Sequence, residues 1–162
     1  MLIVIEGCDG SGKSTLAKFL SDLLGGTIVH LNSNTTNNLV TMIQIIDSSK
    51  ESGNVIIMDR SMYGQFVYQT DLQREQRGWL NSEDISVLES RMLSAGVVPI
   101  LCVADEETLK QRIAQRGDSA DDFDKLNQLE IQDKFIELMK KKSMLPWIKV
   151  SSKHIEWGKL NE

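Results

Sequence analysis

The feature that most constrains this chain is the run Gly7-Cys8-Asp9-Gly10-Ser11-Gly12-Lys13-Ser14, which matches the pattern G-x-x-x-x-G-K-[ST] in full. An apolar run, Leu2–Glu6, precedes it, and apolar side chains at helical spacing follow it over Lys13–Leu24. A buried strand, a glycine-rich loop and a helix are the context that this motif needs. The loop's backbone N–H groups and the helix N-terminus attract phosphate oxygens. The motif therefore predicts a loop that binds the phosphates of a nucleoside triphosphate, expected to be ATP.

Lys13 and Ser14 have the most specific expected roles in this loop. The Lys13 ammonium can reach the β- and γ-phosphates, and the Ser14 hydroxyl can ligate the Mg²⁺ that accompanies ATP. An incidental glycine-rich turn is the competing interpretation, which the strand and helix on either side disfavour. The residues expected to contact ATP are Gly7, Cys8, Asp9, Gly10, Ser11, Gly12, Lys13, Ser14 and Thr15.

Strand-like and helix-like segments alternate along the chain. The expected strands are Leu2–Glu6, Thr27–Leu31, Val55–Met58, Val97–Val103 and Trp147–Ser151. The expected helices are Lys13–Leu24, Leu39–Ser49, Ser61–Thr70, Glu83–Ala95, Glu106–Arg116 and a long helix that ends near Lys142. A polar segment, Asp71–Asn81, and an acidic loop, Gly117–Asp122, lie between helices.

This alternation predicts right-handed βαβ units. We expect an α/β P-loop NTPase fold of the nucleoside monophosphate kinase-like type, with three layers and a mainly parallel five-stranded sheet. One domain over residues 1–162 accounts for the whole chain, because no linker or repeat divides it. Ligands of such sheets bind at the carboxyl ends of the strands.

Composition and charge exclude several classes of protein. The net charge of −5 argues against a general nucleic-acid binder, which normally carries a basic patch. The longest apolar run, Val97–Ala104, is too short to cross a membrane. No basic residue precedes the first apolar run, so no signal peptide is expected. Two distant cysteines, Cys8 and Cys102, fit a reducing compartment, and we expect a cytoplasmic protein.

Asp59 and Arg60 follow the third expected strand directly. A carboxylate at that carboxyl end can hold Mg²⁺ through water or orient the attacking oxygen. The planar guanidinium of Arg60 suits the phosphate of an acceptor. A surface turn after a buried strand is the alternative interpretation.

Arg112 and Arg116 lie four residues apart and therefore share one face of a helix. The phosphate-binding loop contains no arginine, so charge that develops on the transferred phosphoryl group would be balanced by these two. A solvated helix face that pairs with acidic neighbours is the alternative.

The residues Ile5-Glu6-Gly7-Cys8-Asp9-Gly10-Ser11-Gly12-Lys13-Ser14-Thr15 resemble the E-G-x-D-G-x-G-K-[ST]-T opening of thymidylate kinases. Asp59-Arg60-Ser61, followed by Gln65, Tyr68 and Gln69, resembles their D-R-[YHS]…A-Y-Q segment, and Leu101–Arg116 is similar to their fourth strand and lid helix. The resemblance implies that Asp9 contacts the acceptor sugar, that Asp59 serves Mg²⁺, and that Arg60 holds the acceptor phosphate. It implies an acceptor pocket lined by Gln65, Tyr68 and Gln69, and a lid at about residues 112–124.

Three segments depart from that family. Leu31–Thr36 replaces a T-R-E-P-G-G-like loop, Leu39–Asp47 lacks the arginine that packs on the acceptor base, and Asp121–Asp124 has an aspartate where the lid carries arginine.

We therefore expect ATP-dependent phosphoryl transfer to a deoxynucleoside monophosphate, with looser base choice than a strict thymidylate kinase. A deoxynucleoside kinase and a catalytically impaired nucleotide-binding module are the alternatives. The expected partners are small nucleotides; a homodimer is an option that the sequence leaves open. His30 and His154 receive no role.

Overall fold

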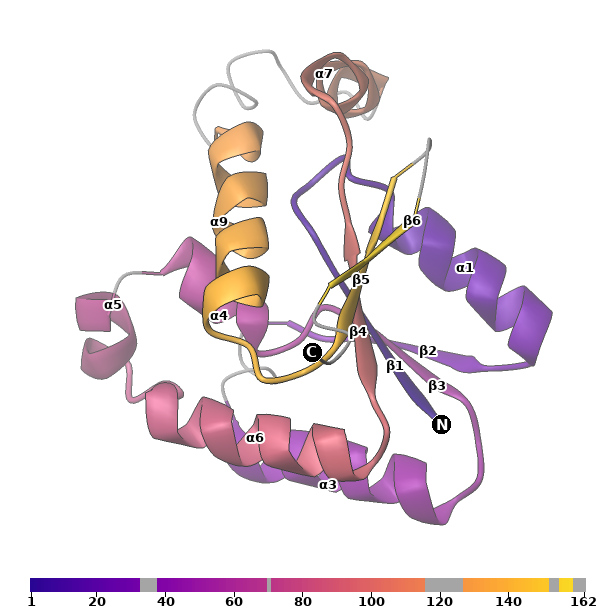
Figure 1. The fold of residues 1–162 in the computed structure, drawn as a ribbon, viewed down its shortest axis with the longest axis vertical. Coiled ribbons are helices and arrows are strands. Elements are labelled where there is room, and N and C mark those ends of the chain that lie inside the picture. Colours follow the sequence, from indigo (N-terminus) through magenta and orange to yellow (C-terminus); the bar gives the residue numbers. More distant parts are fainter. Residues whose placement is uncertain (33–37, 70, 116–126, 152–154, 159–162) are drawn as a thin grey trace.

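Six strands form one sheet in the order β2-β3-β1-β4-β5-β6 in the computed structural model (Figure 1). The structure describes residues 1–32, 38–69, 71–115, 127–151 and 155–158. The first five strands are mutually parallel, and β6 pairs antiparallel with β5. The strands are β1 Leu2–Glu6, β2 Thr27–His30, β3 Ile56–Asp59, β4 Val98–Cys102, β5 Trp147–Val150 and β6 Ile155–Gly158.

Helices cover both faces of this sheet, and they begin and end close to the expected residues. They are α1 Lys13–Leu24, α3 Leu39–Glu51, α4 Tyr63–Tyr68, α5 Asp71–Gln76, α6 Ser82–Ser94, α7 Glu106–Gln115 and α9 Gln128–Lys141. The parallel five-stranded sheet and the helices around it confirm the expected fold class. Two expectations were wrong: the polar segment 71–81 contains helix α5, and a sixth strand extends the sheet.

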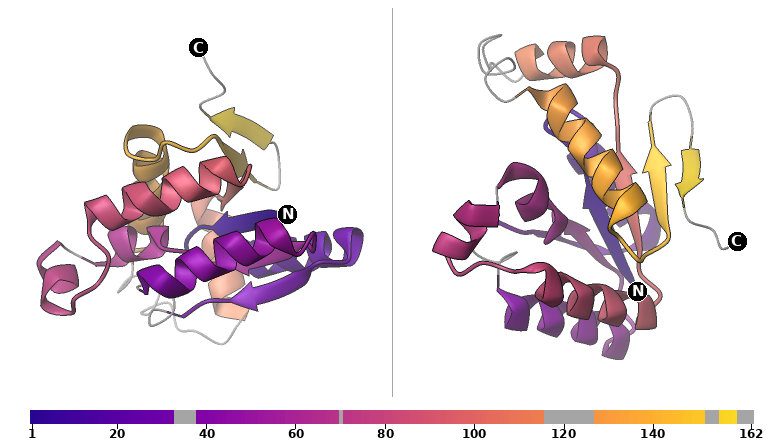
Figure 2. Two further views of the ribbon diagram at one scale, coloured as in Figure 1. Left: turned by 90° about the horizontal axis from the view of Figure 1, so that it is seen from below. Right: turned by 60° about the vertical axis from the view of Figure 1, so that its left-hand side comes forward.

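Alternate residues of β1 enter two different cores, because successive side chains of a strand point to opposite faces. Leu2 and Val4 join the larger core, which α3, α4, α6 and α9 complete. Ile3 and Ile5 join a smaller core beneath α1. Figure 2 shows α3 and α6 lying along one another on one side of the sheet and α1 on the other. Both faces of the central strands are therefore buried, as their continuous apolar sequences predicted.

A buried polar cluster fixes the helix that follows β3. The hydroxyl of Tyr63, at the start of α4, donates to Glu89 Oε1 of α6 at 2.6 Å. The other carboxylate oxygen of Glu89 accepts the backbone N–H of Met144 at 3.0 Å, just after α9. Burial raises the pKa of Tyr63 far above its usual range, so the phenol stays a donor. This cluster ties α4 and α6 to the segment that follows α9.

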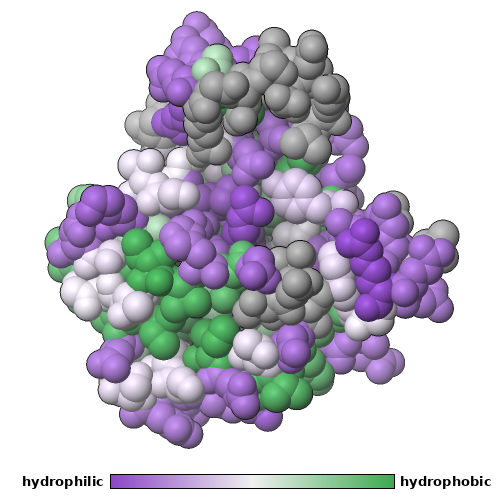
Figure 3. Space-filling model, turned by 180° about the vertical axis from the view of Figure 1, so that it is seen from behind, coloured by the Kyte–Doolittle hydropathy of each residue, from purple (hydrophilic) through white to green (hydrophobic). Residues whose placement is uncertain are grey.

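The carboxyl ends of the parallel strands point toward one end of the molecule, where the loop after β1 lies (Figure 1). Seen from behind, hydrophobic side chains gather in the lower half of the molecule, interspersed with hydrophilic ones (Figure 3). Within the described ranges, no helix is long and apolar enough to span a bilayer.

Candidate active site

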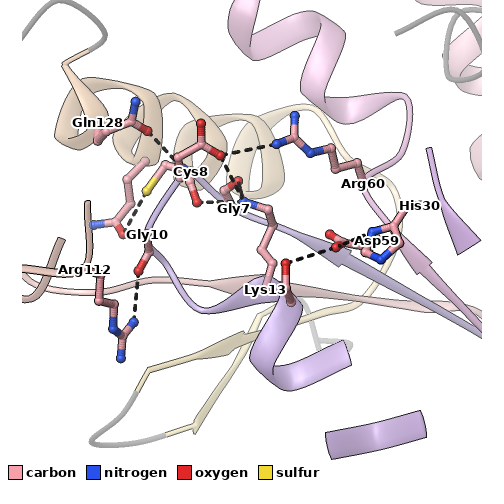
Figure 4. Close-up of polar contacts among 12 residues, drawn as sticks. Gly7, Cys8, Gly10, Lys13, His30, Asp59, Arg60, Arg112 and Gln128 are labelled. Atoms are coloured by element: carbon pink, nitrogen blue, oxygen red, sulfur yellow. Dashed lines mark hydrogen bonds and ion pairs between the residues drawn. The ribbon is translucent and has the colours of Figure 1, made fainter. Parts of the chain in front are cut away.

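The loop between β1 and α1 encloses the ammonium group of Lys13. Its Nζ donates to the carbonyl oxygens of Gly7 at 2.8 Å and Cys8 at 2.7 Å, and it lies 3.8 Å from Asp9 Oδ1 (Figure 4). Lys13 is buried, and burial lowers its pKa. Gly12, the residue before α1, has a left-handed backbone with φ of 99°. The loop therefore holds a buried cation at the N-terminus of a helix, which is the electrostatic arrangement that binds phosphate.

Asp59, at the carboxyl end of β3, lies beside Ser14 and His30. Its Oδ2 accepts the Ser14 hydroxyl at 3.4 Å and lies 3.0 Å from His30 Nδ1. Its Oδ1 is buried and has no hydrogen-bond partner within the described part of the chain. A carboxylate with a spare oxygen, next to a hydroxyl and the phosphate-binding loop, fits the oxygen donor set that Mg²⁺ prefers. Ser14 and Asp59 thus offer neighbouring oxygen ligands that could hold a divalent cation.

A cavity of about 190 Å³ lies next to the start of the loop, at Gly7. Arg60, Gln65, Tyr68 and Gln69, all assigned to the acceptor from the sequence, line it together. The Arg60 guanidinium also lies 3.3 Å from Asp9 Oδ1, so two of the residues expected to contact the acceptor are paired. The remaining lining residues are Glu6, Gly7, Leu31, Asn32, Ser61, Gly64, Trp79 and Phe135.

Glu6, the last residue of β1, is a cavity residue to which the sequence analysis gave no separate role. It is buried, and one carboxylate oxygen accepts both the backbone N–H and the hydroxyl of Ser61. Burial raises the pKa of Glu6 to about 7, against the opposing effect of its hydrogen bonds. A carboxyl group that titrates near neutral pH in a cleft is suited to proton transfer. Its polar position at the end of an apolar strand is the sequence signal that could have singled it out.

Two buried glutamines of α9 bond backbone groups near the site, one in the loop after β1 and one just after β4. Gln128 Oε1 accepts the backbone N–H of Asp9 at 3.0 Å (Figure 4). Gln132 bonds the backbone of Ala104 through both amide atoms, at 2.9 and 3.0 Å. Both side chains are buried. Nothing in their sequence context distinguishes them from other helical glutamines, so sequence reasoning missed them.

A second, larger cavity of about 620 Å³ opens on the α1 side of the loop. Arg112 lines it from α7, and its guanidinium donates to the Gly10 carbonyl at 3.0 Å. Arg116 and most of the expected lid lie outside the described residues. The other lining residues are Gly10, Ser11, Gly12, Thr15, Leu16, Phe19, Cys102, Gln115, Val150 and Ser151.

We expect Arg112→Ala to lower kcat by about 10²-fold, with a smaller change in the KM for ATP. The guanidinium contacts the loop that is expected to bind the phosphates, and its charge would act mainly where negative charge develops in the transition state. Steady-state kinetics with varied ATP measures both constants. Arg91→Ala is the matched control, because Arg91 pairs with Asp47 on the surface between α6 and α3. Equal kcat values for the Arg112→Ala and Arg91→Ala variants would mean that Arg112 has only a structural role.

This sheet order, with the glycine-rich loop between strand β1 and helix α1, is that of a P-loop NTPase fold. The YorR protein of Bacillus subtilis, solved in complex with phosphorylated GDP, has a similar structure with a TM-score of 0.75, 21% identity and coverage of 95% of this chain and 87% of that one. A deoxyadenosine kinase from M. mycoides, solved with dCMP and dCDP, matches with a TM-score of 0.53, 17% identity and coverage of 95% and 92%.

Sequence comparisons add two findings. A probable thymidylate kinase of Thermoplasma acidophilum is 27% identical over 143 residues, which cover 72% of each chain. A sequence model of UPF0114, described only as an uncharacterized protein family, matches residues 3–113. By that match, which spans more than half of the chain, the chain belongs to UPF0114. That description assigns no activity, and the match is unrelated to the comparisons with kinases.

Proposed function

We propose that this protein is a kinase that transfers the γ-phosphoryl group of ATP to a deoxynucleoside monophosphate. The observation that carries the proposal is the position of Arg60. Its side chain lines the acceptor cavity and also the small polar cavity that Lys13, Ser14 and Asp59 line. An arginine between the acceptor site and the phosphate-binding loop can hold an acceptor phosphate next to the transferred group.

The reaction joins one acceptor phosphate oxygen to the γ-phosphorus and breaks the bond from that phosphorus to the oxygen bridging it to the β-phosphate. The products are ADP and a deoxynucleoside diphosphate. Lys13 neutralises charge on the donor phosphates, Arg60 positions the acceptor phosphate, and Arg112 balances charge from the other side of the loop. Ser14 and Asp59 would hold Mg²⁺, which would supply positive charge to neutralise the donor phosphates.

The lining of the acceptor cavity supports a nucleobase as part of the substrate. Tyr68, Trp79 and Phe135 contribute aromatic surface, and Tyr68 contacts Phe135 edge to face with ring centroids 6.1 Å apart. Aromatic faces stack on any base, whereas the amides of Gln65 and Gln69 can donate to and accept from base edges. This combination supports a nucleotide acceptor with moderate base selectivity.

A deoxynucleoside is the second candidate acceptor, and the observation that favours it is Glu6. A monophosphate brings an ionised oxygen as its nucleophile, but a nucleoside hydroxyl must lose a proton to a base. The Glu6 carboxyl lines the acceptor cavity and its pKa is raised to about 7 by burial. A base of that strength would serve a hydroxyl acceptor.

The test measures kcat/KM for dTMP, dCMP, dAMP, dGMP and each parent nucleoside, with ADP formation as the readout. We expect the monophosphates to be preferred. Arg60→Ala should then lower kcat/KM for the preferred monophosphate by about 10²-fold, because the acceptor phosphate loses its charged partner, with little change in the KM for ATP. Arg91→Ala is the control for loss of a surface arginine. A preference for nucleosides would overturn the monophosphate assignment, and no ADP formation with any acceptor would favour the nucleotide-binding module.

The same panel, run against pH, tests the second candidate. If Glu6 is the base, kcat/KM for a nucleoside rises as pH increases through about 7, because only the ionised carboxylate accepts the proton. Glu6→Gln keeps an oxygen that can accept the Ser61 hydrogen bonds. It should remove both the activity on nucleosides and the rise of kcat/KM with pH. A flat profile near pH 7 that Glu6→Gln leaves unchanged would exclude this role.

A further inference from the structure

His30 is the last residue of β2, and the register of the sheet places it beside Asp59. The two residues are direct partners in the parallel pairing of β2 with β3, so their side chains leave the same face of the sheet. The separation of 3.0 Å between His30 Nδ1 and Asp59 Oδ2 follows from that register (Figure 4). The imidazole is 69% exposed, whereas the carboxylate is buried. The cavity they share, about 170 Å³ in volume, also contains Ser14.

The donor atoms of His30 and Ser14 each lie about as far from Asp59 Oδ2 as neighbouring ligands of one metal ion lie from each other. In an octahedral site with bonds of about 2.1 Å, adjacent donor atoms lie about 3.0 Å apart. From Asp59 Oδ2, the observed distances are 3.0 Å to His30 Nδ1 and 3.4 Å to Ser14 Oγ. The second carboxylate oxygen of Asp59 is buried without a hydrogen-bond partner in the described part of the protein. A cation at this point would satisfy a carboxylate that the protein alone leaves incompletely bonded.

We propose that His30 is a third protein ligand of the divalent cation, so that the site selects Mn²⁺ or Co²⁺ over Mg²⁺. The proposal rests on the proposed function in assuming that Ser14 and Asp59 hold a cation beside a triphosphate. Imidazole nitrogen is a good ligand for first-row transition metals, whereas Mg²⁺ prefers oxygen. His30 therefore raises affinity for the transition metals more than for Mg²⁺.

The surroundings indicate that the cation enters together with an anion. Lys13 and Arg60 line the same cavity and repel a bare cation. Nowhere in the described ranges do three His, Cys, Asp or Glu side chains gather at a metal-binding spacing. Phosphate oxygens would supply the remaining ligands and offset the two positive charges. The appropriate probe is therefore Mn²⁺ with inorganic tripolyphosphate, which contains no nitrogen.

Pulsed electron paramagnetic resonance of the Mn²⁺–tripolyphosphate complex with the whole protein tests the ligand directly. We expect modulation from a directly bound ¹⁴N nucleus, replaced by that of ¹⁵N when the protein carries ¹⁵N-histidine. His30→Gln should remove it. His154→Gln, which changes the only other histidine in the chain, should retain it. Calorimetry should show the Co²⁺-to-Mg²⁺ affinity ratio falling about tenfold or more in His30→Gln, the scale seen when metal-site groups are lost.

The alternative is that His30 only donates a hydrogen bond to Asp59. In that case bound Mn²⁺ shows no directly coordinated ¹⁴N, or His30→Gln keeps the signal, and either result overturns the proposal. Failure of Mn²⁺ to bind with tripolyphosphate would overturn it as well. The readouts are spectra and metal affinities, so they test His30 as a ligand even if the protein phosphorylates no acceptor. The substrate panel tests the kinase function separately.

Discussion

Lys13→Ala is expected to lower kcat by about 10³-fold or more while the protein remains folded. Lys13 is the only cation that the loop carbonyls of Gly7 and Cys8 enclose in the described structure. Removing one preorganised group that stabilises transition-state charge commonly reduces kcat by about 10² to 10³-fold, and here the group carries a full charge in a buried position. Its removal leaves the donor phosphates without their nearest neutralising side chain.

Single-turnover ADP formation measures the chemical step, and circular dichroism with thermal unfolding reports whether the fold persists. Lys18→Ala is the matched control: it lies on the same helix and pairs with Asp22 in solvent, 2.9 Å away. That exposed pair contributes little to stability and lies outside the described cavities. If Lys13→Ala kept a turnover near that of the control, the kinase proposal would be wrong, whichever acceptor was used.

The sequence was sufficient for the fold class because its strongest signal, the glycine-rich motif, is local. The motif in Gly7–Ser14 needs a strand before it and a helix after it, and β1 and α1 lie where that requirement puts them. The rule that ligands bind at the carboxyl ends of parallel strands then placed Asp59 and Arg60 near the loop. The distances from Asp59 to Ser14 and from Arg60 to Asp9 agree with that placement.

Residues whose roles depend on nonlocal packing could not be predicted from the sequence. His30 lies beside Asp59 only because β2 pairs with β3, and strand order is not encoded at either residue. Glu6 acquires a pKa of about 7 from its burial, which depends on helices far along the chain. Gln128 reaches Asp9 from a separation of 119 residues. Strand β6 pairs with only one neighbour, and its sequence, Ile-Glu-Trp-Gly, is too short for periodicity to identify.

Gly7→Ala is expected to destabilise the protein by about 3 kcal/mol and to remove nucleotide binding. Gly7 has a φ of 143°, a conformation that is essentially confined to glycine. A Cβ at this position would lie 2.5 Å from the backbone oxygen of Cys102 and 2.7 Å from Ser11 Oγ. The hydroxyl can rotate away, but the Cys102 oxygen belongs to β4, which is fixed by pairing with both β1 and β5. The loop must therefore move, and its carbonyl can no longer hold Lys13.

The control separates close packing from backbone strain. Gly78→Ala also introduces a side chain at positive φ, 62°, but nothing lies within 4 Å of its Cβ. We expect it to cost about 1 kcal/mol, the strain of a single left-handed alanine. For a chain of this length, the difference between the variants corresponds to about 4 to 8 °C in Tm. Urea unfolding gives the free energies, and titration with a fluorescent ATP analogue gives binding. Equal stability of the two variants, with nucleotide binding intact in Gly7→Ala, would mean that the loop yields easily and that Gly7 is not needed to position Lys13.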